Sequence, residues 1–592
     1  MAIFEKKYTN KVLLDDTEKL TSVIENARNI DGHTEYVIRT QRGPLPKKSW
    51  RVSRRYNDFV QLNGALSISG INLPLPPKRI IGNMEPDFIA QRQIALQVRW
   101  IHKNYLNVLL MNPILASSLP MKKFLDPENY TAPLHEIALQ QVSLALRSDA
   151  NFEVGKAIPD MGWRLRKHYY TVKNRQNPKQ ELLLAWVEFG PDKHLQDKDI
   201  QGVFKSLGSL RHPHIEPIVH QHVTDNGALM IRNFYAEGTL RDVLCHTKPK
   251  QPFIKKYGNP KQTKSLTISE IVNYAYQILQ ALGFLHEKGL PYGHLHTGNV
   301  VITSNGAKLL DVENGLLGLP AFYRPYVVQR RKLHATTQVD VYAFGHVLYE
   351  MSFGRPLLEA TCSDLPNCDS NLKNLLEVIL SPEALKQDLP TVARLLEHPF
   401  FELSRRAPIS VGLLEKPHCK LSSHLKEALL EAINKAESRL RDEQKVARHQ
   451  KRLVKVQEMM SSEEEMKKRK QKLKKEQKLA QEQRTSNQLG TNGTKQMNGK
   501  SPERSDSPTS TSTATSVGTL TPPSHGSTEL QSKTAAPPPP PPPPMLANVS
   551  TSSSTTGTSK SIPKSANERT ALLGSICNFD KTNLRKVTNG NH

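Results

Sequence analysis

The distribution of aromatic residues divides this chain of 592 residues into two parts. Nearly all of its 4 Trp, 16 Tyr and 16 Phe lie no later than Phe401, and the rest of the chain is rich in Ser, Thr, Lys and Pro. The chain is too long for one hydrophobic core, and a segment without aromatic residues has little apolar surface with which to build another. We therefore expect folded domains up to about residue 404, followed by helical or disordered sequence.

The chain is strongly basic, with a formal net charge of +25 and a pI near 9.6. Such a charge favours anionic partners, whether nucleic acid, acidic protein or an anionic membrane surface. The five cysteines form no C-x-x-C pair, which fits a reducing compartment and gives no zinc site. Neither a secretory signal nor an apolar stretch long enough to span a bilayer is visible. We expect a cytoplasmic protein that touches membranes only at their surface.

The first 127 residues predict an α+β unit. Three strand-like runs come first, at 20–24, 34–40 and 50–56, and helical periodicity begins at Asp58 and returns over 87–110. Between the helical segments lies Leu73-Pro74-Leu75-Pro76-Pro77-Lys78, which is too rich in proline for a helix and predicts an extended loop.

Three sequence elements of this unit occur in a characteristic order. They are Arg54-Arg55-Tyr56-Asn57-Asp58-Phe59, the proline loop that ends at Lys78, and Arg92 with Leu96 four residues later. Together they resemble the phox-homology (PX) domain over the whole segment 1–127. That resemblance implies a phosphoinositide-binding domain, with a 3-phosphorylated lipid as the expected ligand.

The resemblance also assigns a role to four residues. It implies that Arg55 holds the 3-phosphate and that Tyr56 packs beneath the inositol ring. It implies further that Lys78 reaches the 1-phosphate and that Arg92 binds ring hydroxyls. The chemistry agrees, because a guanidinium forms paired, charge-assisted hydrogen bonds to phosphate and an ammonium supplies a compact charge. In the alternative interpretation, Arg54 and Arg55 are a solvated strand end and Tyr56 is a core aromatic.

A second region, residues 150–404, carries four separated motifs. A helical apolar stripe precedes Tyr292-Gly293-His294-Leu295-His296-Thr297-Gly298-Asn299, which is followed by Asp311-Val312-Glu313. Asp340-Val341-Tyr342-Ala343-Phe344-Gly345 and a final segment at 389–401 come later. In this order the motifs resemble the protein-kinase fold, a two-lobed α+β domain in which Asp340 and Gly345 are scaffold positions.

The phosphate-holding parts of a kinase are missing from this region. Phosphoryl transfer depends on positioning and on charge stabilisation, so its required groups can be checked one by one. Only Gly155 and Gly162 stand where a G-x-G-x-x-G loop is expected, and the strand predicted at 182–188 contains no lysine. The glutamate that would pair with that lysine falls on Val203. We therefore predict that both halves of this ion pair are absent.

The catalytic positions are altered as well. By the resemblance, His294 occupies the position of the base aspartate, His296 that of the second lysine, and Glu313 that of a glycine. Asn299 and Asp311 remain at the positions that face Mg²⁺. They are either a remnant of ATP and Mg²⁺ binding or residues kept for hydrogen bonding. A histidine base is chemically conceivable.

These losses predict a pseudokinase that binds an unidentified protein client and needs no resident cofactor. We expect no catalytic residue in this domain. The alternative is a weak, atypical serine/threonine kinase with residual ATP and Mg²⁺ binding.

Residues 421–484 are dense in Lys, Glu, Gln and Arg and predict a charged helix. Apolar residues become sparse after Val456, so the pattern does not predict a sustained coiled coil. The helix is either solvated or, through the basic run 467–478, in contact with acidic lipid. An apolar stripe begins the segment, at Leu425, Leu429, Ile433 and Leu440.

Residues 485–564 predict a disordered linker rich in Ser, Thr and Pro. Within it, residues 537–544 are all proline, from Pro537 to Pro544, and predict a rigid polyproline II rod. Such a rod binds aromatic grooves, as in profilin or SH3- and WW-type partners, or serves as a spacer.

The C-terminal segment 565–590 begins with a capping box, Ser565-Ala566-Asn567-Glu568, which predicts a short helix. Leu572, Leu573 and Ile576 lie on one face of that helix. With Leu584, Arg585, Lys586 and Val587 further on, the segment resembles a WH2 motif, which implies binding to actin.

The order of these parts resembles a family of PX-domain proteins with a serine/threonine-kinase-like domain. It implies a peripheral adaptor on endosomal or plasma membranes that acts in protein trafficking. We expect no nucleic-acid binding, because no aromatic or base-reading element accompanies the basic run 467–478. The identity of the lipid, the binding of ATP, the client, the oligomeric state and the phosphorylation of the tail are left open.

Overall fold

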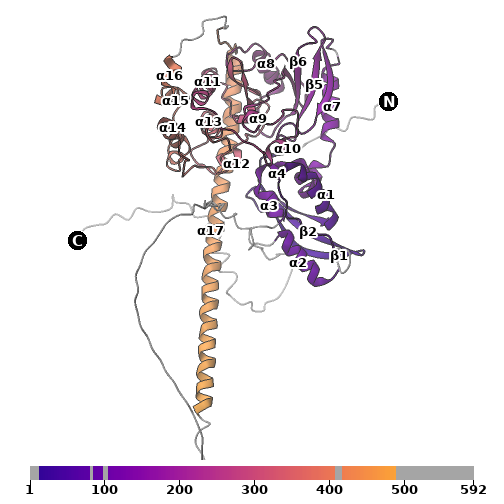
Figure 1. The fold of residues 1–592 in the computed structure, drawn as a ribbon, viewed down its shortest axis with the longest axis vertical. Coiled ribbons are helices and arrows are strands. Elements are labelled where there is room, and N and C mark those ends of the chain that lie inside the picture. Colours follow the sequence, from indigo (N-terminus) through magenta and orange to yellow (C-terminus); the bar gives the residue numbers. More distant parts are fainter. Residues whose placement is uncertain (1–12, 80–83, 98–104, 148, 407–415, 489–592) are drawn as a thin grey trace, which may run out of the picture. The chain divides into compact units, whose positions relative to one another are not determined.

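The computed structural model describes residues 13–79, 84–97, 105–147, 149–406 and 416–488 (Figure 1). The predicted linker from residue 489 on, the proline run 537–544 and the WH2-like segment 565–590 lie outside the described residues. None of the helices in the described part of the chain has both the length and the apolar content needed to cross a bilayer.

The first unit has the predicted α+β order. Its antiparallel sheet has the strand order β1-β2-β3, and six helices and one 3-10 turn follow. Phe59 lies at the centre of its core, with edge-to-face ring contacts to Tyr36, Tyr105 and Phe124 at centroid distances of 6.0, 6.3 and 4.9 Å. The elements are β1 (Leu20–Ile30), β2 (His33–Arg42), β3 (Ser49–Arg55), α1 (Tyr56–Leu66), η1 (Ser67–Ser69), α2 (Pro86–Gln97), α3 (Tyr105–Met111), α4 (Pro113–Ser117), α5 (Leu119–Leu125) and α6 (Pro127–Tyr130).

The second unit begins with a five-stranded antiparallel sheet of order β4-β5-β6-β8-β7. Along β6, successive side chains face opposite sides of the sheet. Leu184 and Trp186 pack against α7, whereas Val187 packs in the cluster that contains Val203 of α8. The elements are α7 (Leu134–Ala145), β4 (Phe152–Ile158), β5 (Lys167–Asn174), β6 (Glu181–Glu188), α8 (Asp197–Gly208), β7 (His220–Val223) and β8 (Gly227–Asn233). Because α7 shares this core, the unit begins before residue 150.

A mostly helical lobe follows the sheet and contains one short hairpin. Its central helix, α13, is buried over most of its length, and Asp340 on it is fully buried. The Asp340 carboxylate accepts hydrogen bonds from the backbone N–H groups of Tyr292 and Gly293 at 2.9 and 2.6 Å. Asp340 thus fixes the start of the loop that carries His294, as expected of a scaffold position.

The elements of this lobe, in chain order, are α9 (Leu240–Leu244), α10 (Phe253–Tyr257), α11 (Ile268–Glu287), η2 (Thr297–Asn299), β9 (Val300–Thr303), β10 (Gly306–Leu309), α12 (Arg324–Val327), α13 (Thr336–Phe353), α14 (Ser370–Leu380), η3 (Ala384–Lys386), α15 (Val392–Leu396), η4 (Pro399–Phe401) and α16 (Glu402–Arg406).

The charged segment forms one long helix, α17 (Ser423–Gln488), whose first part packs against the kinase-like unit. Leu429 and Leu440 are buried in the same core cluster as α11 and α13. The sequence analysis interpreted the whole helix as solvated or lipid-facing. That interpretation is wrong for its beginning, because the apolar stripe is a packing face, and the core of the unit extends beyond residue 404.

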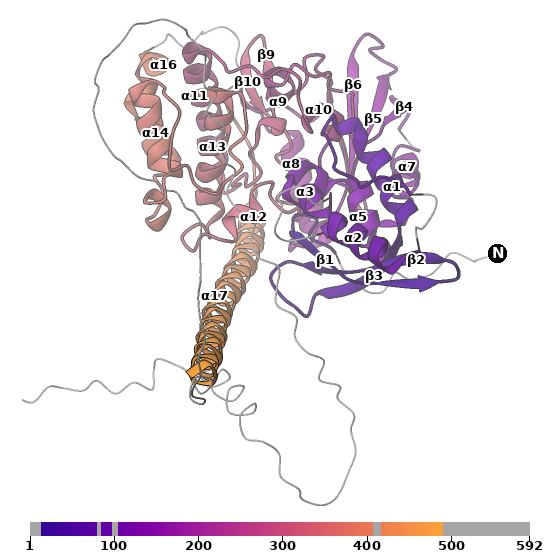
Figure 2. The same cartoon turned by 60° about the horizontal axis from the view of Figure 1, so that its bottom comes forward.

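Helix α17 contacts both lobes. At its start, His424 lies 3.0 Å from Asp199 of α8, and Leu425 packs against Gly202. Further along, α17 runs beside α12, as Figures 1 and 2 both show. There the buried Gln444 side chain directs its amide nitrogen at the carbonyl oxygens of Val327, Arg330 and Leu333, at 3.1, 2.8 and 2.9 Å.

We expect Gln444→Leu to lower the free energy of unfolding by about 1–3 kcal/mol, because three carbonyl groups lose a buried donor. Urea unfolding followed by tryptophan fluorescence measures the effect. Gln457→Leu, an exposed change on the same helix, is the control and should leave stability nearly unchanged. Equal effects of the two changes would show that the contact between α17 and α12 does not stabilise the fold.

Candidate functional sites

Tyr56 contacts both the proline loop and Arg92 in the predicted lipid pocket. Tyr56 begins α1, and its hydroxyl donates a hydrogen bond to the carbonyl of Pro76 in the proline loop. The guanidinium carbon of Arg92, on α2, lies 4.1 Å from the ring centroid, and Arg92 also donates to the carbonyl of Pro77 at 3.2 Å. The structure therefore brings Tyr56 and Arg92 together beside the loop that carries Lys78.

The neighbouring residues Arg54 and Arg55 lie in different environments. Arg54 donates from Nε to the carbonyl of Phe124 at 2.8 Å and stacks on that ring at 5.3 Å, so it ties β3 to α5. Arg55 is exposed at the start of α1, and Lys78 is exposed on the proline loop. Arg55 and Lys78 can therefore meet a ligand from solvent, whereas Arg54 is structural. The predicted lipid contacts of the four residues stay predictions.

A lysine does reach the kinase-like cleft, contrary to the sequence analysis. Lys167 is the first residue of β5, and its Nζ lies 2.6 Å from Oδ2 of Asp311. It stands directly opposite Val187 in the register of β5 and β6, and opposite residues of neighbouring strands face the same side of a sheet. The lysine is absent from β6 as predicted, but the neighbouring strand supplies the cation.

A second cation, Arg232 at the end of β8, pairs with Glu313. Its two terminal nitrogens lie 3.2 and 2.5 Å from the two carboxylate oxygens of Glu313, which is fully buried. One of these nitrogens also lies 3.7 Å from Oδ1 of Asp311. Burial alone would raise the pKa of Asp311, but Lys167 and Arg232 lower it to about 2. The Asp311 carboxyl group therefore stays ionised, and both carboxylates face fixed cations.

His294 has an environment that suits no general base. It is 4 % exposed, and its Nδ1 lies 3.2 Å from a terminal nitrogen of Arg164, so the imidazole accepts there. Burial and the nearby Arg164 hold the pKa of His294 well below its usual range. A base of such low pKa has little affinity for the proton of an acceptor hydroxyl.

His296 is also buried, and burial with the Arg164 charge holds its pKa well below the usual range. Its Nδ1 lies 3.1 Å from the backbone N of Gly298, and its Nε2 lies 3.3 Å from Nε1 of Trp163. A neutral imidazole accepts at only one nitrogen, so we assign the hydrogen bond to the shorter contact. His296 thus shapes the turn before Asn299.

Asn299 and Asp311 do not form a magnesium site in this geometry. The amide nitrogen of Asn299 donates to the hydroxyl of Tyr292 and to the carbonyl of His294, both at 3.0 Å. Magnesium requires several oxygen ligands in near-octahedral geometry, yet the Asp311 oxygens face Lys167 and Arg232. The residues present therefore do not fit the metal that the kinase fold implies, and the geometry favours the hydrogen-bonding interpretation of Asn299.

The loop between β4 and β5 contacts the loop that carries His294. Arg164 donates to the carbonyl of Pro320 at 2.9 Å in addition to its contact with His294. Trp163 packs edge-on against Phe322 with a centroid distance of 5.2 Å. This loop occupies the position in which the sequence analysis looked for a glycine-rich phosphate cover.

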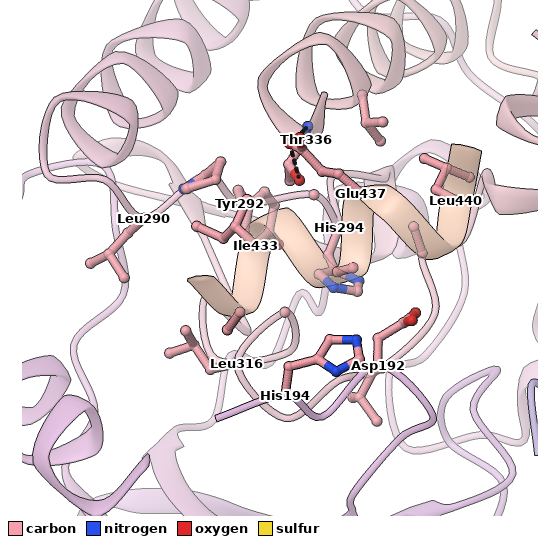
Figure 3. Close-up of a pocket in the computed structure, with 18 of the residues that line it drawn as sticks. Asp192, His194, Leu290, Tyr292, His294, Leu316, Thr336, Ile433, Glu437 and Leu440 are labelled. Atoms are coloured by element: carbon pink, nitrogen blue, oxygen red, sulfur yellow. Dashed lines mark hydrogen bonds between the residues drawn. The ribbon is translucent and has the colours of Figure 1, made fainter. Parts of the chain in front are cut away.

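Helix α17 closes the other side of the His294 loop (Figure 3). Between them lies a cavity of about 130 Å³ with mostly apolar walls, including Leu316, Ile433 and Leu440. At its edge Glu437 accepts a hydrogen bond from the backbone N–H of Thr336 at 2.7 Å. The approach to His294 from this side is therefore covered by the chain itself.

Both domains match known families. The sequence matches the PX domain family over residues 44–128 and the protein kinase domain family over residues 179–401. The fold and the altered cleft thus define a protein in which a PX domain is joined to a kinase-like domain. Mouse (Mus musculus) and rat (Rattus norvegicus) proteins named PX domain-containing protein kinase-like protein are each 47% identical over 458 residues, 77% of this chain and 77% of theirs. The chain belongs to this family of PX domain-containing protein kinase-like proteins.

More distant relatives match shorter parts of the chain. The Dictyostelium discoideum protein named probable inactive serine/threonine-protein kinase slob1 is 31% identical over 290 residues, 44% of this chain and 48% of its own. The Drosophila melanogaster Slowpoke-binding protein is 30% identical over 255 residues, 39% of this chain and 48% of its own. The relatives of this chain therefore include a protein named as a probable inactive kinase.

Three residues of the cleft, Arg164, Lys167 and Arg232, were not predicted from the sequence. A signal existed for one of them, because an acidic residue in place of a glycine at Glu313 requires a buried cation nearby. No linear spacing identified which strand would supply that cation.

We expect the unfolding free energy to depend less steeply on pH in a His294→Gln variant. Below pH 6.5 the unfolded chain protonates this histidine and the folded chain does not, so the wild type loses stability as the pH falls. Gln keeps the acceptor for Arg164 and removes this one proton, which should reduce the slope by about 1.4 kcal/mol per pH unit between pH 6 and 5.

Urea unfolding at several pH values measures that slope. His449→Gln, an exposed change on α17, is the matched control. A His294→Gln slope as steep as that of wild type would contradict the buried, neutral state of His294.

Proposed function

We propose that this protein is a phosphoinositide-binding adaptor at endosomal or plasma membranes, with a pseudokinase that binds a protein client and a tail that binds actin. The arrangement around Tyr56 carries the proposal. Arg92 and the proline loop order the ring from one side, while Arg55 and Lys78 stay exposed beside it. Two exposed cations next to an ordered aromatic surface suit a phosphorylated inositol ring.

The kinase-like lobe acts as a binding scaffold in this proposal. A protein client is supported by the name of a relative, the Slowpoke-binding protein, which is 30% identical over 255 residues. The alternative of a weak kinase gains no support from the cleft, because fixed cations engage Asp311 and His294 is held neutral.

The tail contributes a second attachment. The actin contact rests on the resemblance of residues 565–590 to a WH2 motif, and the proline run 537–544 suits profilin or SH3- and WW-type proteins. Two weak contacts on one chain increase the overall affinity where both ligands are present together and the predicted linker can span the distance between them. Trafficking of membrane proteins along actin is the process that such a combination suits.

We expect Arg55→Ala to reduce binding of the full chain to vesicles containing 3-phosphorylated phosphoinositide at least tenfold, since it removes the paired hydrogen bonds to phosphate. Sedimentation with vesicles of defined lipid composition measures this. Arg51→Ala removes the same charge from an exposed position of β3 and is the control. If the two variants bind equally well, the contact is a general attraction of basic protein to acidic lipid and the pocket is refuted.

We expect the double change Leu572→Ala and Leu573→Ala to abolish actin binding by the full chain, because it removes the apolar face of the predicted helix. Binding to fluorescently labelled monomeric actin measures the loss. Thr588→Ala, beyond the Leu584-Arg585-Lys586-Val587 segment, is the control. Wild-type affinity in the double variant would contradict a WH2-like contact.

A further inference from the structure

The cleft between the lobes carries more positive than negative charge. Lys167 pairs with Asp311, and Arg232 pairs with Glu313. Lys256, also at the cleft, pairs with Asp242 at 3.0 Å and adds no net charge. One cation, Arg164, is then in excess.

Arg164 has only neutral partners for its terminal nitrogens. Among the described residues no carboxylate is recorded within ion-pair distance of it, and it donates to the Pro320 carbonyl and to the neutral His294 ring. A partly buried cation without a counter-charge is costly. An anion in the cleft would remove that cost.

The rest of the cleft offers apolar walls. Leu183 and Ala185 of β6 and Met230 of β8 line it on the small-lobe side, and Val301 and Leu310 line it on the other. Apolar walls with a few polar groups at one end are typical of small-ligand sites. A flat aromatic base between such walls would place its attached phosphates toward the cations.

We propose that this cleft binds a nucleoside triphosphate in the absence of divalent metal. Lys167 and Arg232 supply next to Asp311 the positive charge that metal ions supply in an active kinase. Arg164 provides the additional charge that meets the phosphates. The site lies in a different domain from the lipid pocket, so the inference is independent of the proposed adaptor function.

The test is calorimetric titration of the full chain with ATP in EDTA and in excess magnesium chloride. We expect ATP to bind in EDTA at least as tightly as with magnesium, because the metal neutralises phosphates that the protein's cations would otherwise meet. An affinity that falls tenfold or more in EDTA overturns the proposal, and so does the absence of any binding in EDTA.

Two substitutions with opposite expected effects on ATP affinity distinguish a loss of charge from damage to the fold. Lys167→Met should weaken ATP binding at least tenfold, whereas Asp311→Asn should strengthen it at least threefold, because it removes the carboxylate that competes for Lys167. Lys173→Met, at an exposed position of the same strand, is the control. If Lys167→Met equals Lys173→Met, or if Asp311→Asn weakens binding, the proposal is wrong. Should Lys167→Met not fold, Lys167→Arg keeps the charge and must keep the metal-independent affinity.

Further ligands and one further variant define the site. Adenosine alone and inorganic tripolyphosphate alone should each bind at least tenfold more weakly than ATP. Tripolyphosphate that binds as tightly as ATP would indicate an anion site without a place for the base and would overturn the nucleotide assignment. Arg55→Ala should leave ATP affinity unchanged, and a loss would place the nucleotide in the lipid pocket instead.

Discussion

The Asp311 carboxylate lies between two cations, and the form of the whole cleft depends on that arrangement. Lys167 and Arg232 belong to strands β5 and β8 of the small lobe, whereas Asp311 and Glu313 belong to the segment after β10. The buried Glu313 carboxylate and the partly buried Asp311 carboxylate, two residues apart, would repel each other without these partners. The glutamate in place of glycine, the loss of lysine from β6 and the lysine at the start of β5 are therefore parts of one charge arrangement that joins the two lobes.

Helix α17 makes a second connection between the same lobes from outside the cleft. Arg439 on α17 pairs with Asp192, before α8, at 2.5 Å. Arg324 of α12 contacts Glu443 of α17 at 2.9 Å and lies 3.2 Å from both Asp15 and Asp192. An active kinase must open and close its lobes to exchange nucleotide. In this chain, ion pairs and a packed helix link the two lobes and limit such motion.

The sequence predicted those features that depend on local pattern. The three strands and the helices of the first unit and the apolar stripe of α11 follow from periodicity, whereas the scaffold role of Asp340 follows from the resemblance to the kinase fold. The strand that supplies the cleft lysine could not be predicted, because the alignment of Lys167 with Val187 depends on cross-strand register and not on linear spacing. The stripe that begins at Leu425 was visible, but nothing in a stripe tells which surface it covers.

The use of arginine shows why net charge alone says little about partners. Arg54 binds a carbonyl and an aromatic ring, and Arg232 binds a buried carboxylate, so neither is available to an external anion. Arginine suits such positions because its planar, permanently charged group forms several directed hydrogen bonds and stacks on rings. Some of the basic side chains are thus engaged within the fold and do not contact external anions. Among the described residues, the side chains of Arg55 and Lys78 in one domain and of Arg164 in the other form no ion pair with a carboxylate, so these cations remain available to an anionic ligand.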